Sequence, residues 1–345
     1  MNGSIRAREG DFLETVEGLI FDVKGLVHPS DRVIAFLRYI ESLSGDRVRD
    51  GKKYIKIYSL STREEILRDR YPHYIYYDEI FGDWLEGVPN NLIAKLYEPS
   101  KKVSDLLNKS SLDIVEAEAL KFIFTLHEYS NVSLKNLGLS GSVLVDLHSS
   151  ESDIDAVVYG RRNCFTVHEW LRTLMDEEKG GFSPYSLSDL RRLYDFRSKD
   201  TSMPFERFCE VERRKAYQGK FLGRDFFVRF IPDWDEVDES YGERLYRNAG
   251  YAKIKARIED DSCSIFTPCK YAISEIKILE GTDNIRPLRE IVSFRGRFCE
   301  QARRGEWIIA QGKVEKVIEN DGSEYYRMIL GAKPSDFMIL ESSIL

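Results

Sequence analysis

The sequence contains little cysteine and little histidine, which limits the redox and metal chemistry that it can support. The five cysteines and five histidines include no Cys-x-x-Cys pair of the kind found in zinc knuckles, and no histidine pair at metal-ligand spacing. We therefore expect buried free thiols in a reducing compartment and structural histidines. His148 differs in its position, because it lies between the two segments of the candidate site described below.

Long apolar runs are also missing. No stretch approaches the roughly 18–20 residues that span a bilayer, and the first twenty residues carry charges where a signal peptide has its apolar core. These features predict a cytoplasmic protein with no membrane partner. Hydrophobic residues make up 42% of the chain and the net charge is −7. This charge argues against a protein that coats nucleic acid with its whole surface, but it permits a local basic groove.

No low-complexity linker or internal repeat divides the 345 residues, so the expected boundaries follow changes in secondary-structure pattern. We predict an α+β protein with three domains. A small α+β domain is expected over residues 1–105, and a mixed sheet with helices over residues 106–238. An all-β domain is expected over residues 239–345, and its five short strands are typical of a small barrel such as the OB fold.

The expected elements follow from apolar periodicity and from turn residues. The first domain is expected to contain strands over 18–25, 32–39 and 54–58. The central domain is expected to contain strands over 137–140, 154–159 and 226–231, with helices over 112–129, 165–176, 186–194 and 204–217. The last domain is expected to contain strands over 251–258, 272–279, 291–298, 307–314 and 325–330.

Two short segments of the central domain carry the chemistry. A strand leads into Gly141-Ser142, ten residues follow, and a second strand carries Asp153 and Asp155. Side chains two residues apart on a strand point the same way, so the two carboxylates should project together, about 7 Å apart. They repel each other, and a divalent cation relieves that repulsion. Oxygen ligands on a rigid strand suit Mg²⁺ with substrate phosphates.

The glycine and the serine add the means to hold a phosphate. Gly141 allows the backbone to approach a ligand closely, and Ser142 offers a hydroxyl beside the N–H groups of a helix start. A Gly-Ser pair alone usually marks a turn, and an Asp-x-Asp pair alone usually marks a solvated strand edge. The combination at this spacing indicates a site for a phosphate and a metal.

Residues 138–160 resemble the nucleotidyltransferase superfamily that includes DNA polymerase beta, the CCA-adding enzymes, poly(A) polymerases and small antibiotic-modifying nucleotidyltransferases. The whole chain is also similar to a group of predicted nucleotidyltransferases. The resemblance implies that Gly141 and Ser142 contact a nucleoside triphosphate, and that Asp153 and Asp155 hold Mg²⁺ or Mn²⁺. It covers residues 106–235 and does not extend to the flanking domains.

The resemblance also implies a third carboxylate on a later strand, and here the sequence departs from the family. Arg229 stands where the CCA-adding enzymes have an aspartate before two apolar residues and a proline. A guanidinium cannot accept a proton or ligate a metal, but it can bind phosphate. Asp225 lies on the same face of this strand and can supply the third acid if the alignment shifts.

Basic residues surround this strand and admit two interpretations. They either bind phosphate beside the metal site or form a solvated face with ion pairs; they are Arg207, Arg213, Arg214, Lys215, Lys220, Arg224 and Arg229. Arg297 and Phe298 of the last domain could likewise stack on bases or pack in the core.

Two functions therefore remain open. The first is a metal-dependent nucleotidyltransferase that moves a nucleoside monophosphate to an acceptor hydroxyl of RNA, a protein or a small molecule. The second is a catalytically degenerate protein that binds a nucleotide or RNA on the same fold. Arg229 favours the second function, and the intact Asp153 and Asp155 favour the first.

Overall fold

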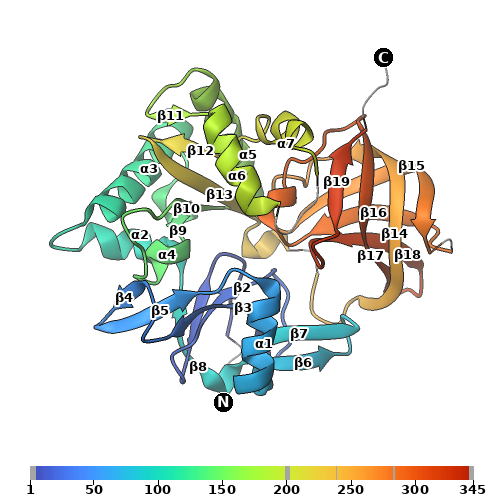
Figure 1. The fold of residues 1–345 in the computed structure, drawn as a ribbon, viewed down its shortest axis with the longest axis horizontal. Helices are drawn as coiled ribbons and strands as arrows, with labels where there is room; N and C mark the ends of the chain where they lie inside the picture. Colours follow the sequence, from blue (N-terminus) through green and yellow to red (C-terminus); the bar gives the residue numbers. More distant parts are fainter. Residues whose placement is uncertain (1–4, 199–202, 238, 283, 342–345) are drawn as a thin grey trace. The chain divides into compact units, whose positions relative to one another are not determined.

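The computed structural model describes residues 5–198, 203–237, 239–282 and 284–341 (Figure 1). Helices and three β-sheets are both present, so the α+β prediction is confirmed. The chain forms two compact units. The first comprises the chain up to Asp78, Trp84–Ser183 and Tyr217–Tyr241, and the second comprises Glu79–Asp83, Pro184–Ala216 and the chain from Gly242 onward. The division into three domains stays a prediction.

The N-terminal sheet of the first unit is antiparallel and curls into a half-barrel. Its strands are β1 (Phe12–Thr15), β2 (Ile20–Val23), β3 (Arg32–Glu41), β4 (Arg47–Arg49), β5 (Lys52–Lys56), β6 (Ile75–Asp78), β7 (Asp83–Pro89) and β8 (Ile93–Tyr97). They follow the order β4-β5-β3-β2-β1-β8, and β7 pairs with β3 and β6. The long strand β3 pairs with β2, β5 and β7 along its length, which lets the sheet bend. Helices α1 (Leu60–Arg70) and α2 (Pro99–Leu107) follow β5 and β8.

The central sheet of the first unit has the order β11-β12-β13-β10-β9. Its strands are β9 (Leu137–Leu139), β10 (Ile154–Tyr159), β11 (Phe182–Ser183), β12 (Gln218–Phe221) and β13 (Arg224–Ile231), and its helices are α3 (Ile114–Ser130), α4 (Gly141–Leu144) and α5 (Arg161–Asp176). Strands β10 and β13 are parallel, and the other pairs are antiparallel. The predicted bounds of β10 are confirmed. The strand could be predicted because a run of apolar residues follows its alternating start.

The two faces of this sheet have different neighbours. On one face, the ring of Phe122 from α3 lies 5.2 Å from the ring of Phe226 on β13. On the other face, Val157 of β10 packs in a cluster with Leu26 of the N-terminal segment, residues 9–26. Asp155 is two residues from Val157 and therefore lies on this second face. The candidate site thus lies on the side of the sheet that the N-terminal segment covers.

A group of four charges, two buried acids and two partly buried cations, ties the N-terminal segment to the central sheet. Glu9 is fully buried, and its carboxylate accepts hydrogen bonds from Arg229 of β13 and from the Gly25 N–H at 2.7 Å. Lys24 Nζ lies 3.3 Å from Glu9 and 2.7 Å from Asp22. Asp22 Oδ1 lies 3.8 Å from Arg229 Nη1. Two partly buried cations therefore balance the charges of two buried acids.

The second unit contains α6 (Leu187–Arg197), α7 (Phe205–Glu212) and the strands β14 (Leu245–Asp260), β15 (Cys269–Gly281), β16 (Leu288–Ser293), β17 (Trp307–Ile318), β18 (Glu324–Leu330) and β19 (Phe337–Leu340). The strands pair in the order β14-β15-β16-β18-β17-β19, and β14 also pairs with β17. Five of them therefore form a ring that returns to its first strand. The pair β16 and β18 is parallel.

Two elements of this unit end earlier than expected. The strand expected over 291–298 ends at Ser293, because the Ser293 hydroxyl donates to the Leu330 carbonyl at 2.8 Å and accepts from the Arg295 N–H at 3.1 Å. The helix expected over 204–217 ends at Glu212. Beyond it, the buried Lys215 ammonium bonds to Glu212 at 2.6 Å, and the chain leaves the helix to reach β12.

Substitution of Arg229 tests the buried charge group. Arg229→Met should lower the free energy of unfolding by about 3–5 kcal/mol, because Glu9 would keep a buried charge with less compensation. Urea unfolding measures the change. Adding Glu9→Gln to Arg229→Met should restore part of the loss. The control is Arg68→Met, which removes an exposed arginine paired with Glu64; equal effects of Arg229→Met and Arg68→Met would contradict the assignment.

Candidate functional site

The Gly-Ser turn lies directly against the carboxyl group of Asp155. Gly141 begins α4 with φ +60°, and a Cβ atom at this position would lie 1.8 Å from Asp155 Oδ2. The N–H of Ser140 donates to the Asp155 carbonyl at 2.7 Å. Position 141 therefore requires glycine for two reasons, the left-handed backbone and the lack of space for a side chain.

Ser142 follows in α4 with its hydroxyl buried. The side chain is 1% exposed, and in the described part of the chain the Ser142 Oγ has no hydrogen-bond partner. Buried hydroxyl groups nearly always have a partner, because desolvation without one is unfavourable. The unpartnered hydroxyl, one residue from Gly141, is the kind of group that a polar ligand would satisfy.

Asp153 and Asp155 repel each other as their spacing predicts. Burial raises the pKa of Asp155 to about 7, and the charge of Asp153 adds to the rise. The cations Lys56, Arg229 and Arg38 act in the opposite direction. The Asp155 carboxyl group therefore keeps its proton to a higher pH than an ordinary aspartate does. A divalent cation would stabilise the charged form of both carboxylates.

The pairing of β10 with β13 places Arg229 beyond the two aspartates. Asp155 is level with Phe227, and Val157 is level with Arg229. Arg229 lies on the same face as Asp155, and its guanidinium binds the buried Glu9. The position that the resemblance assigns to the third carboxylate therefore holds a cation that contributes to the packing of the N-terminal segment.

Asp225 lies at the end of β13 that is nearest to the Asp-x-Asp motif. Ile154 is level with Phe226, so continuing the register by one pair places Asp153 level with Asp225. Side chains of level residues on parallel strands share a face. Asp225 is exposed, and its Oδ1 lies 2.9 Å from Lys220 Nζ. Of the two positions considered on this strand, Asp225 is the one that puts an acid beside Asp153.

Sequence reasoning missed Lys56 and Arg38, two cations of the N-terminal sheet. Both act electrostatically on Asp155, and Lys56 also acts on Asp153. Lys56 ends β5 and pairs with Tyr39 of β3. No local pattern distinguishes these residues from other strand cations, so a sequence signal for them could come only from knowledge of how the two sheets pack.

His148, which lies between the two segments of the candidate site in the sequence, contacts the start of α3. Its Nε2 is 2.7 Å from Asp113 Oδ2 at the start of α3. Asp113, Glu116 and His148 bring three metal-type ligand atoms within 4.8 Å of one another. Both Glu116 oxygens, however, accept hydrogen bonds from Lys109 at 2.7 Å, and Asp113 and Glu116 form a helix capping box. These contacts explain the cluster as a capped helix start without a metal.

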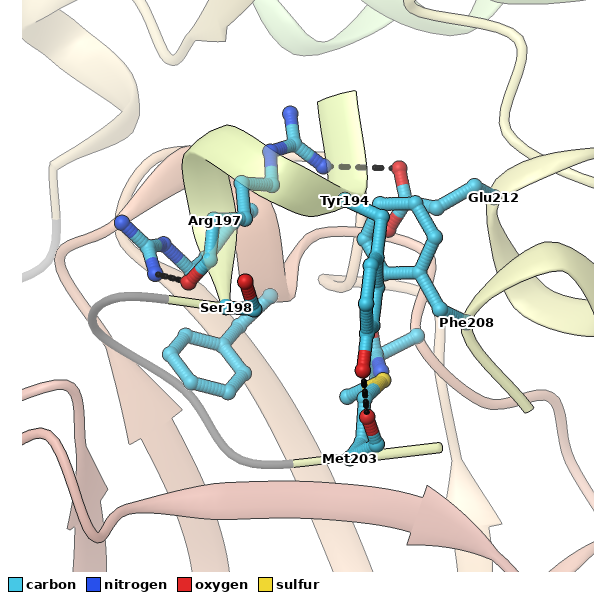
Figure 2. A pocket seen from close by; sticks show the side chains of 9 residues that line it. Tyr194, Arg197, Ser198, Met203, Phe208 and Glu212 are labelled. Atoms are coloured by element: carbon cyan, nitrogen blue, oxygen red, sulfur yellow. Dashed lines mark hydrogen bonds and ion pairs between the residues drawn. The ribbon is translucent and has the colours of Figure 1, made fainter. Parts of the chain in front are cut away.

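A pocket in the second unit is separate from the aspartate motif (Figure 2). Arg197 of α6 pairs with Glu212 of α7 at 2.7 Å, and the Tyr194 hydroxyl donates to the Met203 carbonyl at 2.8 Å. Its lining is completed by Ser198, Phe208, Arg297, Phe298 and Gln301. Phe298 is 1% exposed, which favours the core-packing interpretation of this residue over base stacking.

The basic residues around β13 are for the most part held in salt bridges. The pairs are Arg207 with Glu210, Arg214 with Glu306, Lys215 with Glu212, Lys220 with Asp225, Arg224 with Glu118 and Arg229 with Glu9. They also divide between the two units, since the residues up to Ala216 belong to the second unit and those from Tyr217 to the first. The ion-pair interpretation is therefore favoured over a single phosphate-binding patch.

Comparison with known proteins identifies a relative over almost the whole chain. The protein named "Uncharacterized protein MJ1086" from Methanocaldococcus jannaschii is 31% identical over 342 residues, which cover 96% of this chain and 98% of that protein. The chain belongs to the family of MJ1086. No family model and no solved structure matches it. Among the described residues, no helix combines the length and the apolar composition needed to cross a membrane.

The contact between Gly141 and Asp155 can be tested with two alanine variants. Gly141→Ala should lower the free energy of unfolding by about 2–4 kcal/mol, since the new methyl group meets the Asp155 carboxyl group in a left-handed backbone. Gly223→Ala is the matched control, because Gly223 has φ +87° but no atom within 4 Å of an added Cβ. The control should cost about 1–2 kcal/mol from backbone strain alone. Equal costs would show that the close approach has no energetic weight.

The raised pKa of Asp155 predicts a pH dependence of stability. The folded protein binds this proton more tightly than the unfolded chain, so the contribution is fully present in acid and is lost as the pH rises through about 7. Asp155→Asn cannot ionise. It should therefore be more stable than the wild type at pH 8, by at least about 1 kcal/mol, and this advantage should shrink towards pH 5. Thermal unfolding in the presence of a chelator measures both. An advantage that does not change with pH would refute the shift.

Proposed function

We propose that the protein is a metal-dependent nucleotidyltransferase, which transfers a nucleoside monophosphate from a nucleoside triphosphate to an acceptor hydroxyl. One observation carries the proposal. The Gly141 backbone lies against the Asp155 carboxyl group, and a Cβ atom at position 141 would lie 1.8 Å from Asp155 Oδ2. Within the described residues, the hydroxyl of the neighbouring Ser142 has no hydrogen-bond partner. This arrangement supports the proposal because it puts the proposed phosphate-binding turn in contact with one of the proposed metal ligands.

The residues present fit a divalent cation. Asp153 and Asp155 raise each other's energy without one, as the pKa of Asp155 reflects, and they would hold Mg²⁺ or Mn²⁺. The metal, when bound, neutralises charge on the triphosphate and favours loss of the proton from the acceptor hydroxyl. Gly141 and Ser142 would bind phosphate oxygens through backbone N–H groups and the free hydroxyl.

Asp225 is the proposed third acid. In the reaction, the acceptor oxygen bonds to the α-phosphorus, the bond between the α- and β-phosphates breaks, and pyrophosphate leaves. The hydroxyl proton would pass to the Asp225 carboxylate, which lies level with Asp153 when the register of β10 and β13 is continued by one pair. Arg229 is proposed to stabilise the fold through Glu9 rather than to take part in the reaction.

The second unit supports RNA as an acceptor. Its strand order β14-β15-β16-β18-β17 returns to β14, with β16 and β18 parallel. We propose that this ring is an OB-like barrel, a small five-stranded Greek-key barrel that in other proteins binds oligonucleotides. Protein side chains and small hydroxyl compounds remain alternative acceptors.

A degenerate nucleotide- or RNA-binding protein is the second candidate. Two observations favour it: Arg229 replaces an acid, and Asp225 forms a salt bridge with Lys220 that a catalytic base would have to leave. In that case the site would bind nucleotide with a metal but would not turn it over.

A transfer assay and a binding assay separate the two. The wild type is incubated with labelled ATP, CTP, GTP and UTP, Mg²⁺ or Mn²⁺, and RNA or small acceptors. Asp225→Asn should lower the transfer rate by about 100-fold or more while metal-dependent triphosphate binding persists, and Asp155→Asn should abolish both. Asp235→Asn, at an exposed acid beyond β13, is the control and should change neither.

The outcomes have distinct meanings. Binding that depends on Asp155 without any transfer would favour the degenerate protein. The absence of metal-dependent triphosphate binding in the wild type would remove the nucleotidyltransferase and the degenerate nucleotide-binding protein, and would leave only a protein that binds RNA.

A further inference from the structure

The N-terminal sheet holds two cations side by side near the aspartate motif. Lys56 Nζ lies 5.1 Å from the ring centre of Tyr58 and 6.0 Å from that of Tyr39. The Arg38 guanidinium carbon lies 5.2 Å from the same Tyr58 ring. One aromatic side chain thus has a lysine and an arginine in contact range, and the two positive charges repel each other.

Lys56 and Arg38 differ from Arg229 and Lys24, the other cations of this region, in their salt bridges. In the described part of the chain, Lys56 and Arg38 form no salt bridge, whereas Arg229 and Lys24 bind Glu9. Arg38 donates one hydrogen bond, to the Ile57 carbonyl at 3.3 Å. Two adjacent cations without a bound carboxylate are unfavourable in a half-buried position unless an anion joins them.

The aspartates supply the other side of the charge pattern. Burial acts to lower the pKa of Lys56, but Tyr39 and Asp153 keep it above its ordinary value, so the side chain is an ammonium ion at neutral pH. Lys56 and Arg38 both attract Asp155 through space without binding it. With a metal ion beside the carboxylates and phosphate oxygens beside the two cations, negative and positive charges would alternate from the aspartates to Lys56 and Arg38.

We infer that Lys56 and Arg38 form the binding site for the terminal phosphates of the triphosphate, so that part of the nucleotide site belongs to the N-terminal sheet. The inference rests on the proposed function. Lysine binds phosphate as a compact charge, and arginine binds it with two parallel hydrogen bonds. Both residues lie outside residues 138–160, which carry the sequence resemblance. The N-terminal sheet thereby acquires a direct role in selecting polyphosphates.

The inference predicts that loss of one cation weakens phosphate binding without weakening metal binding. Lys56→Met keeps the aliphatic part of the side chain and removes one positive charge near Asp153 and Asp155. Affinity for Mn²⁺ alone should stay the same or rise, because a repelling charge is gone. Affinity for inorganic tripolyphosphate with Mg²⁺ should fall about tenfold or more, because a charge-assisted contact is lost.

Calorimetric titration of the full chain measures both affinities, with tripolyphosphate as a probe that needs no knowledge of the base. Lys52→Met is the matched control, since Lys52 lies on the same strand, is exposed and pairs with Glu41; it should leave both affinities unchanged. Arg38→Met is the second variant and should repeat the result of Lys56→Met. Thermal unfolding confirms that each variant is folded.

The results separate this inference from the proposed function. Tripolyphosphate binding by Lys56→Met and Arg38→Met at wild-type affinity would overturn the inference and leave the proposed function standing. Loss of Mn²⁺ binding in the same variants would also overturn it, because it would show a structural defect in the aspartate motif. If the wild type bound Mn²⁺ no better than Asp155→Asn, the proposed function itself would fail, whatever the two cations bind.

Discussion

The first unit depends on the pairing of Arg229 with the fully buried Glu9. A carboxylate without water is tolerated only when cations and N–H groups surround it, and Glu9 receives the Arg229 guanidinium, the Lys24 ammonium and the Gly25 N–H. This pairing holds the N-terminal segment on the face of the central sheet that carries Asp155. The same contact explains why an arginine occupies a strand position where the resemblance leads one to expect an acid.

Charges near this face fall into two groups with different consequences. Arg229 and Lys24 are bound to acids and stabilise the fold. Lys56 and Arg38 form no salt bridge within the described residues and act on Asp155 only through space. A cation that is already neutralised can contribute little to a ligand, whereas an unneutralised one retains most of its attraction for an anion. Whether a cation already forms a salt bridge is therefore a better guide to the candidate site than the number of basic residues nearby.

The sequence predicted the local parts of this arrangement and missed the distant ones. The bounds of β10 follow from alternating polar and apolar residues, and the turn at Gly141 follows from the backbone freedom of glycine. Both signals lie within a few neighbouring residues. Glu9 and Arg229 are 220 positions apart, and no periodicity links them. Lys56 likewise can be recognised as part of the candidate site only from the packing of β5 near the central sheet. The strand expected over 291–298 ended early because a hydrogen bond between Ser293 and the distant Leu330 turns the chain.

The path of the chain between the two units has a consequence for how such a protein can arise. The chain passes from one unit to the other five times, after residues 78, 83, 183, 216 and 241. Neither unit therefore corresponds to one continuous stretch of the gene, and no single recombination event can transfer one of them intact to another protein. The first unit cannot be complete until the ribosome has reached Tyr241. Such a chain is expected to be inherited as a whole, and the match to MJ1086 indeed covers 98% of that protein.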